Sequence, residues 1–124
     1  MKTYTVKQIT FNKEEDDMPN KLGWDGAVAR SDKWRAKMDY MHFQDREGDI
    51  FNKDDIALYN DKFLVQAESL DHVFHLTNMW NDLEKVHIYE HGHSTSVGDI
   101  IVDNETNKHY IVAGFGFDEI EVAA

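Results

Sequence analysis

Two apolar runs near the end of the chain show the clearest pattern of hydrophobic and polar positions. Residues 100–102 and 110–112 are rich in β-branched and aromatic side chains, a composition typical of strands. The polar segment between them, 103–108, has the residue types of a turn. Gly114 and Gly116 follow the second run, where glycine permits a bend or a bulge. The pattern predicts a β-hairpin.

Apolar residues recur at helical spacing in two other segments. The first, 32–43, follows Ser31, and the second, 70–80, follows Ser69. A serine before such a segment is a favourable N-cap, because its side-chain oxygen accepts a hydrogen bond from a free backbone N–H. We therefore expect two helices. The methionines and aromatic residues of the first helix indicate core packing rather than a cofactor pocket.

Shorter patterns complete the predicted sheet. Alternation over residues 4–11 predicts a first strand, and a weaker alternation over 117–122 predicts a last strand that pairs back into the sheet. Runs 56–59 and 63–65 form either a hairpin or a strand that leads into the second helix. This order predicts an α+β fold in a single domain, residues 1–124: a small antiparallel sheet with two helices packed on one face and a C-terminal β-hairpin.

The segments between these elements are polar or lack a clear period. Residues 12–20 form an acidic run with the chain's only proline, and we expect a solvated loop there. Residues 22–26 indicate a turn that carries a tryptophan, and 27–29 form a short strand or lead into the first helix. The charged segment 44–55 is expected to be a loop, whereas 81–90 shows no clean period.

The overall charge is strongly acidic. Thirteen Lys and Arg stand against twenty-four Asp and Glu, which gives a formal net charge of −11. Such a balance argues against binding to DNA, RNA or an anionic membrane, because these partners attract basic surfaces. It fits a host protein with a basic surface, although the charge also favours solubility alone. The candidate partner-binding residues are the four consecutive carboxylates Glu14, Glu15, Asp16 and Asp17.

Cysteine is absent, so disulfides, thiolate metal sites and a cysteine nucleophile are excluded. Near the N-terminus no continuous apolar segment resembles a signal peptide, and no window has the length of a membrane span. We expect a cytoplasmic protein without membrane contact. An exposed sheet edge would allow either a monomer or a homodimer.

Three histidines lie close together in the sequence and precede a carboxylate. His87, His91 and His93 are followed by Asp99, and two histidines two positions apart would share one side of a strand. Imidazole and carboxylate are ligands that zinc accepts. The spacing matches no standard metal motif, so these histidines are weak metal candidates, and we expect no metal or other cofactor.

A hydrolase interpretation would use the same stretch. Ser94 or Ser96 would act as the nucleophile, His93 as the base and Asp99 as the group that orients it. The nucleophile-elbow motif is missing, and a base adjacent in sequence to its nucleophile seldom has the required geometry. The structural alternative is that the His93, Ser94 and Ser96 side chains bind backbone groups and fix a turn.

A two-part motif runs through the last half of the chain. It consists of Gly92, His93, Ser94, Ser96, Val97, Asp99, Ile100 and Ile101, and then of Tyr110, Val112, Gly116 and Phe117. These residues resemble the pattern of the YodL-like family of bacterial, phage and conjugative-element proteins. Ala113 and Gly114 depart from the family pattern, which prefers Asp and Ser there. The resemblance implies an origin in mobile elements and no established enzymatic activity. Within the family motif, the site residues are His93, Ser94, Ser96, Asp99, Gly116 and Phe117.

Two classes of function follow from these observations. The first is a non-catalytic acidic binding module, a phage or mobile-element product that binds and inhibits a host protein, with mimicry of nucleic acid as a special case. The alternative is a metal-assisted or hydrolytic enzyme that uses His87, His91, His93 and Asp99. We favour the binding module, because an acidic balance without a complete catalytic motif is more readily explained by protein contact.

Overall fold

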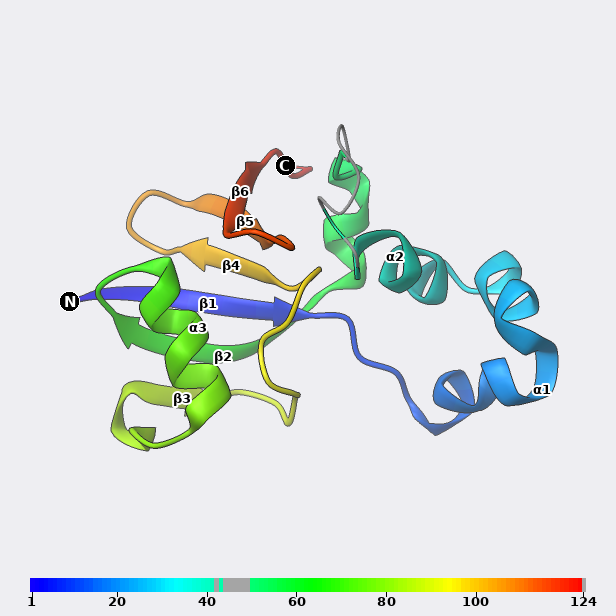
Figure 1. The fold of residues 1–124 in the computed structure, drawn as a ribbon, viewed down its shortest axis with the longest axis horizontal. Helices are drawn as coiled ribbons and strands as arrows, with labels where there is room; N and C mark the ends of the chain where they lie inside the picture. Colours follow the sequence, from blue (N-terminus) through cyan, green and yellow to red (C-terminus); the bar gives the residue numbers. More distant parts are fainter. Residues whose placement is uncertain (42, 44–49, 124) are drawn as a thin grey trace.

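Six strands form one antiparallel sheet in the computed structural model, which describes residues 1–41, 43 and 50–123. The strands are β1 (Lys2–Gln8), β2 (Asn60–Ala67), β3 (Val86–Ile88), β4 (Ile100–Asp103), β5 (Lys108–Val112) and β6 (Phe117–Ile120). Their spatial order is β3-β2-β1-β4-β5-β6 (Figure 1). The first strand therefore lies in the middle of the sheet, and β3 and β6 form its edges.

Helical elements lie on the sheet and beyond one end of it. They are α1 (Lys13–Arg30), α2 (Asp32–Tyr40), the 3-10 helix η1 (Lys53–Leu58), α3 (Leu70–Met79) and the 3-10 helix η2 (Leu83–Lys85). Figure 1 shows α3 across one face, whereas α1 and α2 lie past the end at which β1 finishes. The α+β class with an antiparallel sheet is confirmed.

The first core cluster lies between α3 and one face of the sheet. Val73 and Leu76 of α3 are buried together with Val6, Phe63 and Ile101 of the three central strands. The helix begins as predicted, because the Ser69 hydroxyl oxygen accepts a hydrogen bond of 3.1 Å from the backbone N–H of His72. It ends at Met79, and its C-cap Trp80 has a left-handed backbone with φ 54°.

The second core cluster corrects the predicted arrangement of the two helices. Ala36 and Tyr40 of α2 are buried with Ile100 and Val102 of β4. These two β4 side chains alternate with Ile101, which belongs to the α3 cluster, so they point to the opposite face of the sheet. The prediction of two helices on one face is therefore wrong for α2, and each helix contributes to a different face.

The acidic run at 12–20 is helical, not a loop. Asn12 and Glu15 form a capping box, in which the Asn12 side chain accepts from the Glu15 N–H at 2.8 Å and the Glu15 carboxylate accepts from the Asn12 N–H at 3.0 Å. Carboxylates in the first helical turn also interact favourably with the helix dipole. The prediction of a loop gave too much weight to Pro19 and to the missing apolar period.

Pro19 is tolerated inside α1 because another group takes over its missing hydrogen bond. Proline has no backbone N–H, so the carbonyl oxygen four residues earlier, on Glu15, receives no bond from position 19. The indole Nε1–H of Trp34 donates to that oxygen at 2.7 Å. Trp34 also stacks on Phe11, with ring centroids 4.0 Å apart, and meets Trp24 of α1 edge to face at 5.6 Å, which holds α1 against α2.

The remaining predictions have mixed outcomes. The turn predicted at 22–26 is confirmed only as a kink in α1 at Gly23, where φ is 73°, and 27–29 belongs to the same helix. Of the two apolar runs, 56–59 lies mostly in η1, and 63–65 lies in β2, which leads into α3. The hairpin β4–β5 and the return of β6 onto β5 are confirmed. Part of the loop predicted at 44–55, residues 44–49, lies outside the described residues.

Candidate functional site

The segment 92–99 between β3 and β4, here called the motif loop, is held to β1 by one buried amide. The side chain of Gln8, with 0% exposure, donates from Nε2 to the His93 carbonyl oxygen at 2.7 Å. Its Oε1 accepts from the His93 backbone N–H at 3.1 Å. The amide thus pairs with His93 as a neighbouring strand would, although the two residues are 85 positions apart.

Two glycines let the motif loop approach its neighbours closely. A Cβ atom on Gly92 would lie 2.5 Å from Oε1 of Gln8, and one on Gly98 would lie 2.7 Å from the Tyr40 carbonyl oxygen. Gly98 also has φ +94°, a backbone conformation that L side chains rarely adopt. Close packing therefore explains both glycines, Gly92 against Gln8 of β1 and Gly98 against the end of α2.

Asp99 is a buried carboxylate with 1% exposure. Its Oδ2 accepts from the Ser96 backbone N–H at 2.9 Å and from Gln8 Nε2 at 3.1 Å, and it lies 3.8 Å from Nδ1 of His93. Burial raises the Asp99 pKa to about 6, whereas the nearby His93 ring, the Ser96 N–H and Lys37 oppose that rise. The carboxylate fixes the turn of the motif loop.

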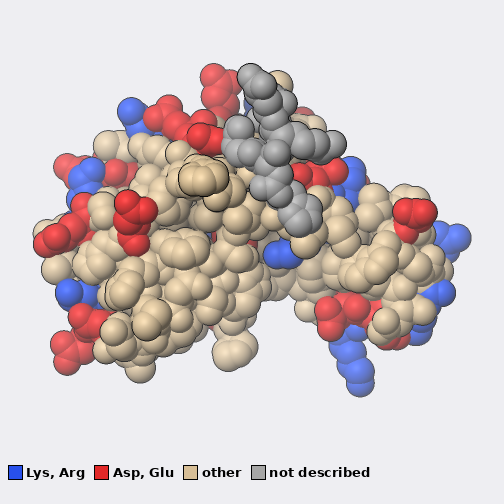
Figure 2. Space-filling view, viewed as in Figure 1, with Lys and Arg blue, Asp and Glu red and all other residues tan. Residues whose placement is uncertain are grey.

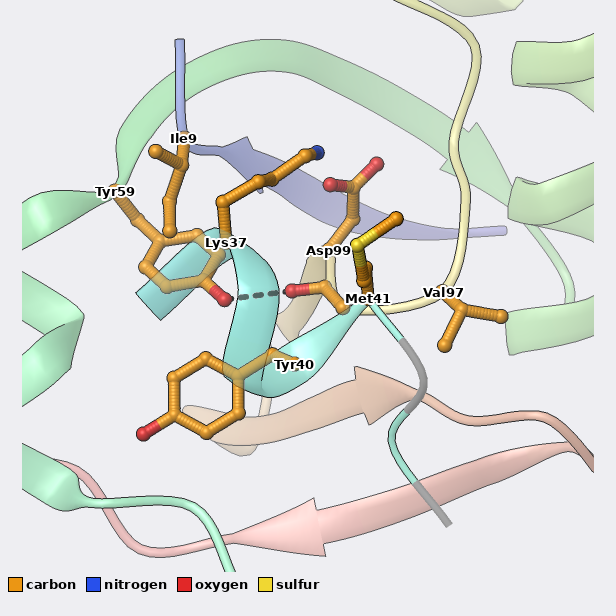
Figure 3. Close-up of a pocket in the computed structure, with 8 residues that line it drawn as sticks. Ile9, Lys37, Tyr40, Met41, Tyr59, Val97 and Asp99 are labelled. Carbon is orange, nitrogen blue, oxygen red and sulfur yellow. Dashed lines mark hydrogen bonds between the residues drawn. The ribbon is translucent and has the colours of Figure 1, made fainter. Parts of the chain in front are cut away.

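Aromatic side chains close the site on the α2 side. Figure 3 shows Tyr40, Tyr59 and Lys37 near Asp99. The Tyr59 hydroxyl donates to the Gly98 carbonyl oxygen at 2.6 Å. The packing of these described residues leaves no cavity of the size of a water molecule. Asp99 therefore faces a packed interior on this side and not a substrate pocket.

A pair of threonines joins the motif loop to α3. Thr95 is buried, and its hydroxyl lies 2.5 Å from that of Thr77. The Thr95 carbonyl oxygen accepts from Nδ2 of Asn78 at 3.1 Å. Because the Thr77 hydroxyl donates to the Val73 carbonyl oxygen at 2.9 Å, the Thr95 hydroxyl is the donor between the two threonines.

The predicted residues Ser94, Ser96, His93 and Asp99 do not form the geometry required of a serine hydrolase. Nδ1 of His93 lies 2.8 Å from the backbone carbonyl oxygen of Ser94, not from a serine hydroxyl. The Ser94 hydroxyl oxygen instead accepts from the Trp80 indole at 3.4 Å, and Ser96 contributes its backbone N–H to Asp99. The contact of the His93 ring agrees with the structural interpretation, because this side chain binds a backbone group of the loop. The Ser94 and Ser96 contacts do not, because neither serine binds the loop backbone through its side chain.

The three histidine candidates for a metal do not meet. His87 pairs with Leu64 in the β3–β2 ladder, next to Ile88, which pairs with Phe63 of the α3 face. Side chains alternate along a strand, so His87 points to the face opposite that of Phe63. His91 and His93 lie beside Phe63. Among residues 1–41, 43 and 50–123, no group of three or more His, Cys, Asp or Glu residues is placed to hold a metal ion.

The four carboxylates predicted to bind a partner occupy two different environments. Glu14 and Asp16 are exposed and Asp17 is partly exposed, and together with Lys13, Asn20 and Lys21 they line an open groove of about 610 Å³ on α1. Glu15 instead binds Lys33 Nζ at 3.0 Å in addition to its capping contacts, which lower its pKa. Glu15 is therefore a structural residue.

The last two motif residues lie where β6 begins: Gly116 ends the turn after β5, and Phe117 is the first residue of β6. Gly116 has φ +72°, and its carbonyl oxygen accepts from the Ala113 N–H at 2.9 Å. Phe117 is partly buried and meets Phe74 of α3 edge to face, with ring centroids 6.4 Å apart. Both residues hold the end of the sheet in place.

Several residues that build this site were missed from the sequence. Gln8 could have been found, because strand alternation places this polar residue on the same face as Tyr4 and Val6. Thr77 and Thr95 carry no such signal, since their pairing depends on how α3 lies over the loop.

Comparisons with known proteins do not assign the chain to a family. No protein-family model, curated protein or solved structure matches the chain. The resemblance to the YodL-like family therefore stays a prediction, carried by the residues of the motif loop. Within the described part of the chain, no helix has both the length and the apolar character needed to cross a membrane.

Proposed function

We propose that the chain is a non-catalytic binding module that recognises the basic surface of a host protein and inhibits that protein. The observation that carries this proposal is the group of exposed and partly exposed carboxylates on the first turns of α1, in a molecule of net charge −11. Glu14, Asp16 and Asp17 are the binding residues. Opposite charges across an interface increase the association rate and exclude wrong partners.

The contacts of the motif loop support a binding function over catalysis. His93 and Asp99, which the enzyme alternative needs, contact Gln8 and the loop's own backbone. A catalytic base must reach the proton that it abstracts, and a nucleophile must lie within hydrogen-bond distance of that base. These residues hold the loop in place, which leaves the surface charge as the feature that a structural role does not explain.

Acidic side chains extend well beyond α1. Figure 2 shows Asp and Glu atoms along the upper border of one face and again over the region of α1. If the carboxylates imitate the phosphates of nucleic acid, the bound protein is one that itself binds DNA or RNA. A phage or mobile-element product with this property would compete with nucleic acid for its host target.

The test is affinity capture from a bacterial host lysate with the parent protein and a neutralised variant. The variant carries Glu14→Gln, Asp16→Asn and Asp17→Asn, and it leaves Glu15 unchanged because that residue caps the helix. We expect the parent to retain a specific host protein and the variant to lose it. Retention by the parent should weaken as salt is raised, because salt screens surface charges.

A matched control removes the same number of charges elsewhere. Glu68→Gln, Glu105→Gln and Glu121→Gln neutralise three exposed carboxylates on other elements, and this control should retain the host protein. Addition of duplex DNA to the lysate should displace a partner that normally binds nucleic acid. Equal loss of the partner by both variants would show that total charge matters and that α1 is not the binding site.

A further inference from the structure

A depression with apolar walls lies on the α3 face of the sheet, beside edge strand β3. It encloses about 380 Å³ between Phe63, Trp80 and Ile88, and His93 and Ser94 lie at its polar side. Trp80 meets Phe63 edge to face, with ring centroids 5.2 Å apart, and its indole N–H points to Ser94. Phe63 forms the floor of the depression with 1% exposure, and Gly92 packs closely on its ring, because a Cβ there would lie 3.2 Å from Cζ of Phe63.

Two exposed apolar side chains adjoin this depression: Ile88, which forms one wall, is 50% exposed, and Met79, next to Trp80, is 60% exposed. Leu83 of η2, an element that contacts β3, is 61% exposed. Tyr89 instead packs edge to face on His87, on the opposite face of the sheet. Figure 2 shows mainly uncharged atoms over the part of this face formed by α3 and β3, with charged side chains at its border. A grouped apolar surface with a polar rim is typical of a protein-binding site.

The backbone of β3 offers hydrogen bonds at the same place. The Tyr89 N–H donates to the Lys62 carbonyl oxygen at 2.8 Å, so Tyr89 faces β2. Inward and outward backbone groups alternate along an antiparallel edge strand, so the N–H and C=O of Ile88 point away from the sheet. Ile88 thus presents its side chain to the depression and its backbone to the open edge.

We propose that this surface binds an extended segment of a partner protein, which adds a strand to β3 and places a large apolar side chain in the depression. Charge selects the partner. Glu90 pairs with Lys62 at 3.0 Å and Asp82 with Lys85 at 3.3 Å, so Glu84 leaves this surface with an excess of negative charge in a molecule of net charge −11. A segment with Lys or Arg beside its apolar residue has the charge that complements this surface. A second copy of this acidic chain would be repelled from the surface by like charge. The site is separate from the α1 carboxylates.

The proposal is tested with a phage-displayed library of random peptides, panned on the immobilised protein. Enriched peptides should combine a large apolar residue with flanking Lys or Arg. Synthetic copies with a fluorescent label then give a Kd by anisotropy. No enrichment over background, or enrichment of acidic peptides, would overturn the proposal.

Variants at Ile88 separate the side-chain contact from the backbone contact. Ile88→Ala should raise the Kd about tenfold, the scale expected for an anchor residue. Ile88→Pro should raise it further, because proline also removes the outward N–H without breaking the β2 ladder. Phe115→Ala is the control: Phe115 is 97% exposed in the β5–β6 turn, and its loss should leave the Kd unchanged. Far-UV circular dichroism confirms that each variant is folded.

Amide hydrogen exchange gives a second readout on the unmodified protein. Binding of an enriched peptide should slow exchange at the Ile88 N–H, and His87, which faces β2, should change little. Unchanged exchange at Ile88 would exclude strand addition, and a peptide-free dimer in sedimentation would assign the surface to a second copy. The host protein captured from the lysate separates the two proposals. If the α1 variant loses that protein and Ile88→Ala retains it, only the inference about β3 is contradicted. If Ile88→Ala loses it and the α1 variant retains it, only the role of α1 is contradicted.

Discussion

At position 98, both the backbone conformation and the packing require glycine. We expect Gly98→Ala to lower the free energy of unfolding by about 2 to 5 kcal/mol, because left-handed strain adds to overpacking against Tyr40. Urea denaturation measures this loss. Gly116→Ala is the matched control, since Gly116 has φ +72° but nothing within 4 Å of its added Cβ. It should cost only about 1 to 2 kcal/mol, and equal costs at both sites would contradict the contact with Tyr40.

Asp99 makes the stability of the fold depend on pH. Its pKa is raised from 3.8 to about 6 by burial, so the folded protein binds this proton more tightly than the unfolded chain does. Its contribution to stability is therefore complete below about pH 4 and is lost as the pH rises to about 6. We expect Asp99→Asn to gain stability relative to the parent over that window, by about 3 kcal/mol at most.

Urea denaturation of both proteins from pH 4 to pH 7.5 measures this difference. Carboxylates with lowered pKa values, such as Asp55 and Asp103, act in the opposite direction but are present in both proteins. The variant His93→Gln removes the ring whose charge opposes the raised Asp99 pKa, so the window should move to higher pH. A difference that does not vary with pH would show that Asp99 is ionised throughout.

Helix α1 depends on its capping box more than on a buried face. Ala27 is its buried residue among those described, so packing stabilises this helix weakly. We expect Asn12→Ala to lower the free energy of unfolding by about 1 kcal/mol. Asn20→Ala, at an exposed position within the same helix, should cost under about 0.5 kcal/mol. Urea denaturation followed by circular dichroism and by tryptophan fluorescence compares the two variants.

Local pattern explains why some elements were predictable from the sequence and α1 was not. Helix α3 combines a serine N-cap with an apolar face, so its bounds follow closely from the sequence. Asn12 and Glu15 have the spacing of a capping box, and that signal could have located the start of α1. The bond from Trp34 that replaces the one lost at Pro19 comes from another helix, so no local pattern could reveal it.

The functional predictions, like the prediction for α1, depend on contacts between distant parts of the chain that the sequence does not reveal. Residue types suggested that His93, Ser94 and Asp99 share a site, and His93 and Asp99 do lie close together. Their roles depend on Gln8, whose amide reaches them from the other half of the chain. Sequence spacing identified the segment but could not distinguish a structural hydrogen-bond network from a catalytic one.

At the scale of the whole molecule, the excess of negative charge should oppose compact folding. Repulsion among carboxylates is strongest at low ionic strength, where the Debye length is about 30 Å, and it is largely screened at 0.15 M salt. We expect the Tm to rise by several degrees between these conditions, with NaCl and KCl giving the same rise. A falling Tm would show that ion pairs dominate, such as Arg35 with Asp55, whose Nη2 and Oδ1 atoms lie 2.7 Å apart.

The central position of β1 has a consequence for folding during synthesis. Tyr4 of β1 pairs with Val65 of β2 on one side and with Asp103 of β4 on the other. The second side of β1 therefore stays unpaired until β4 has been synthesised. Each pairing closes a long loop, and such non-local contacts slow folding. A nascent chain that ends before β4 would leave one side of β1 open to other proteins. We therefore expect ribosome-bound chains shorter than about 100 residues to need chaperones that cover this strand.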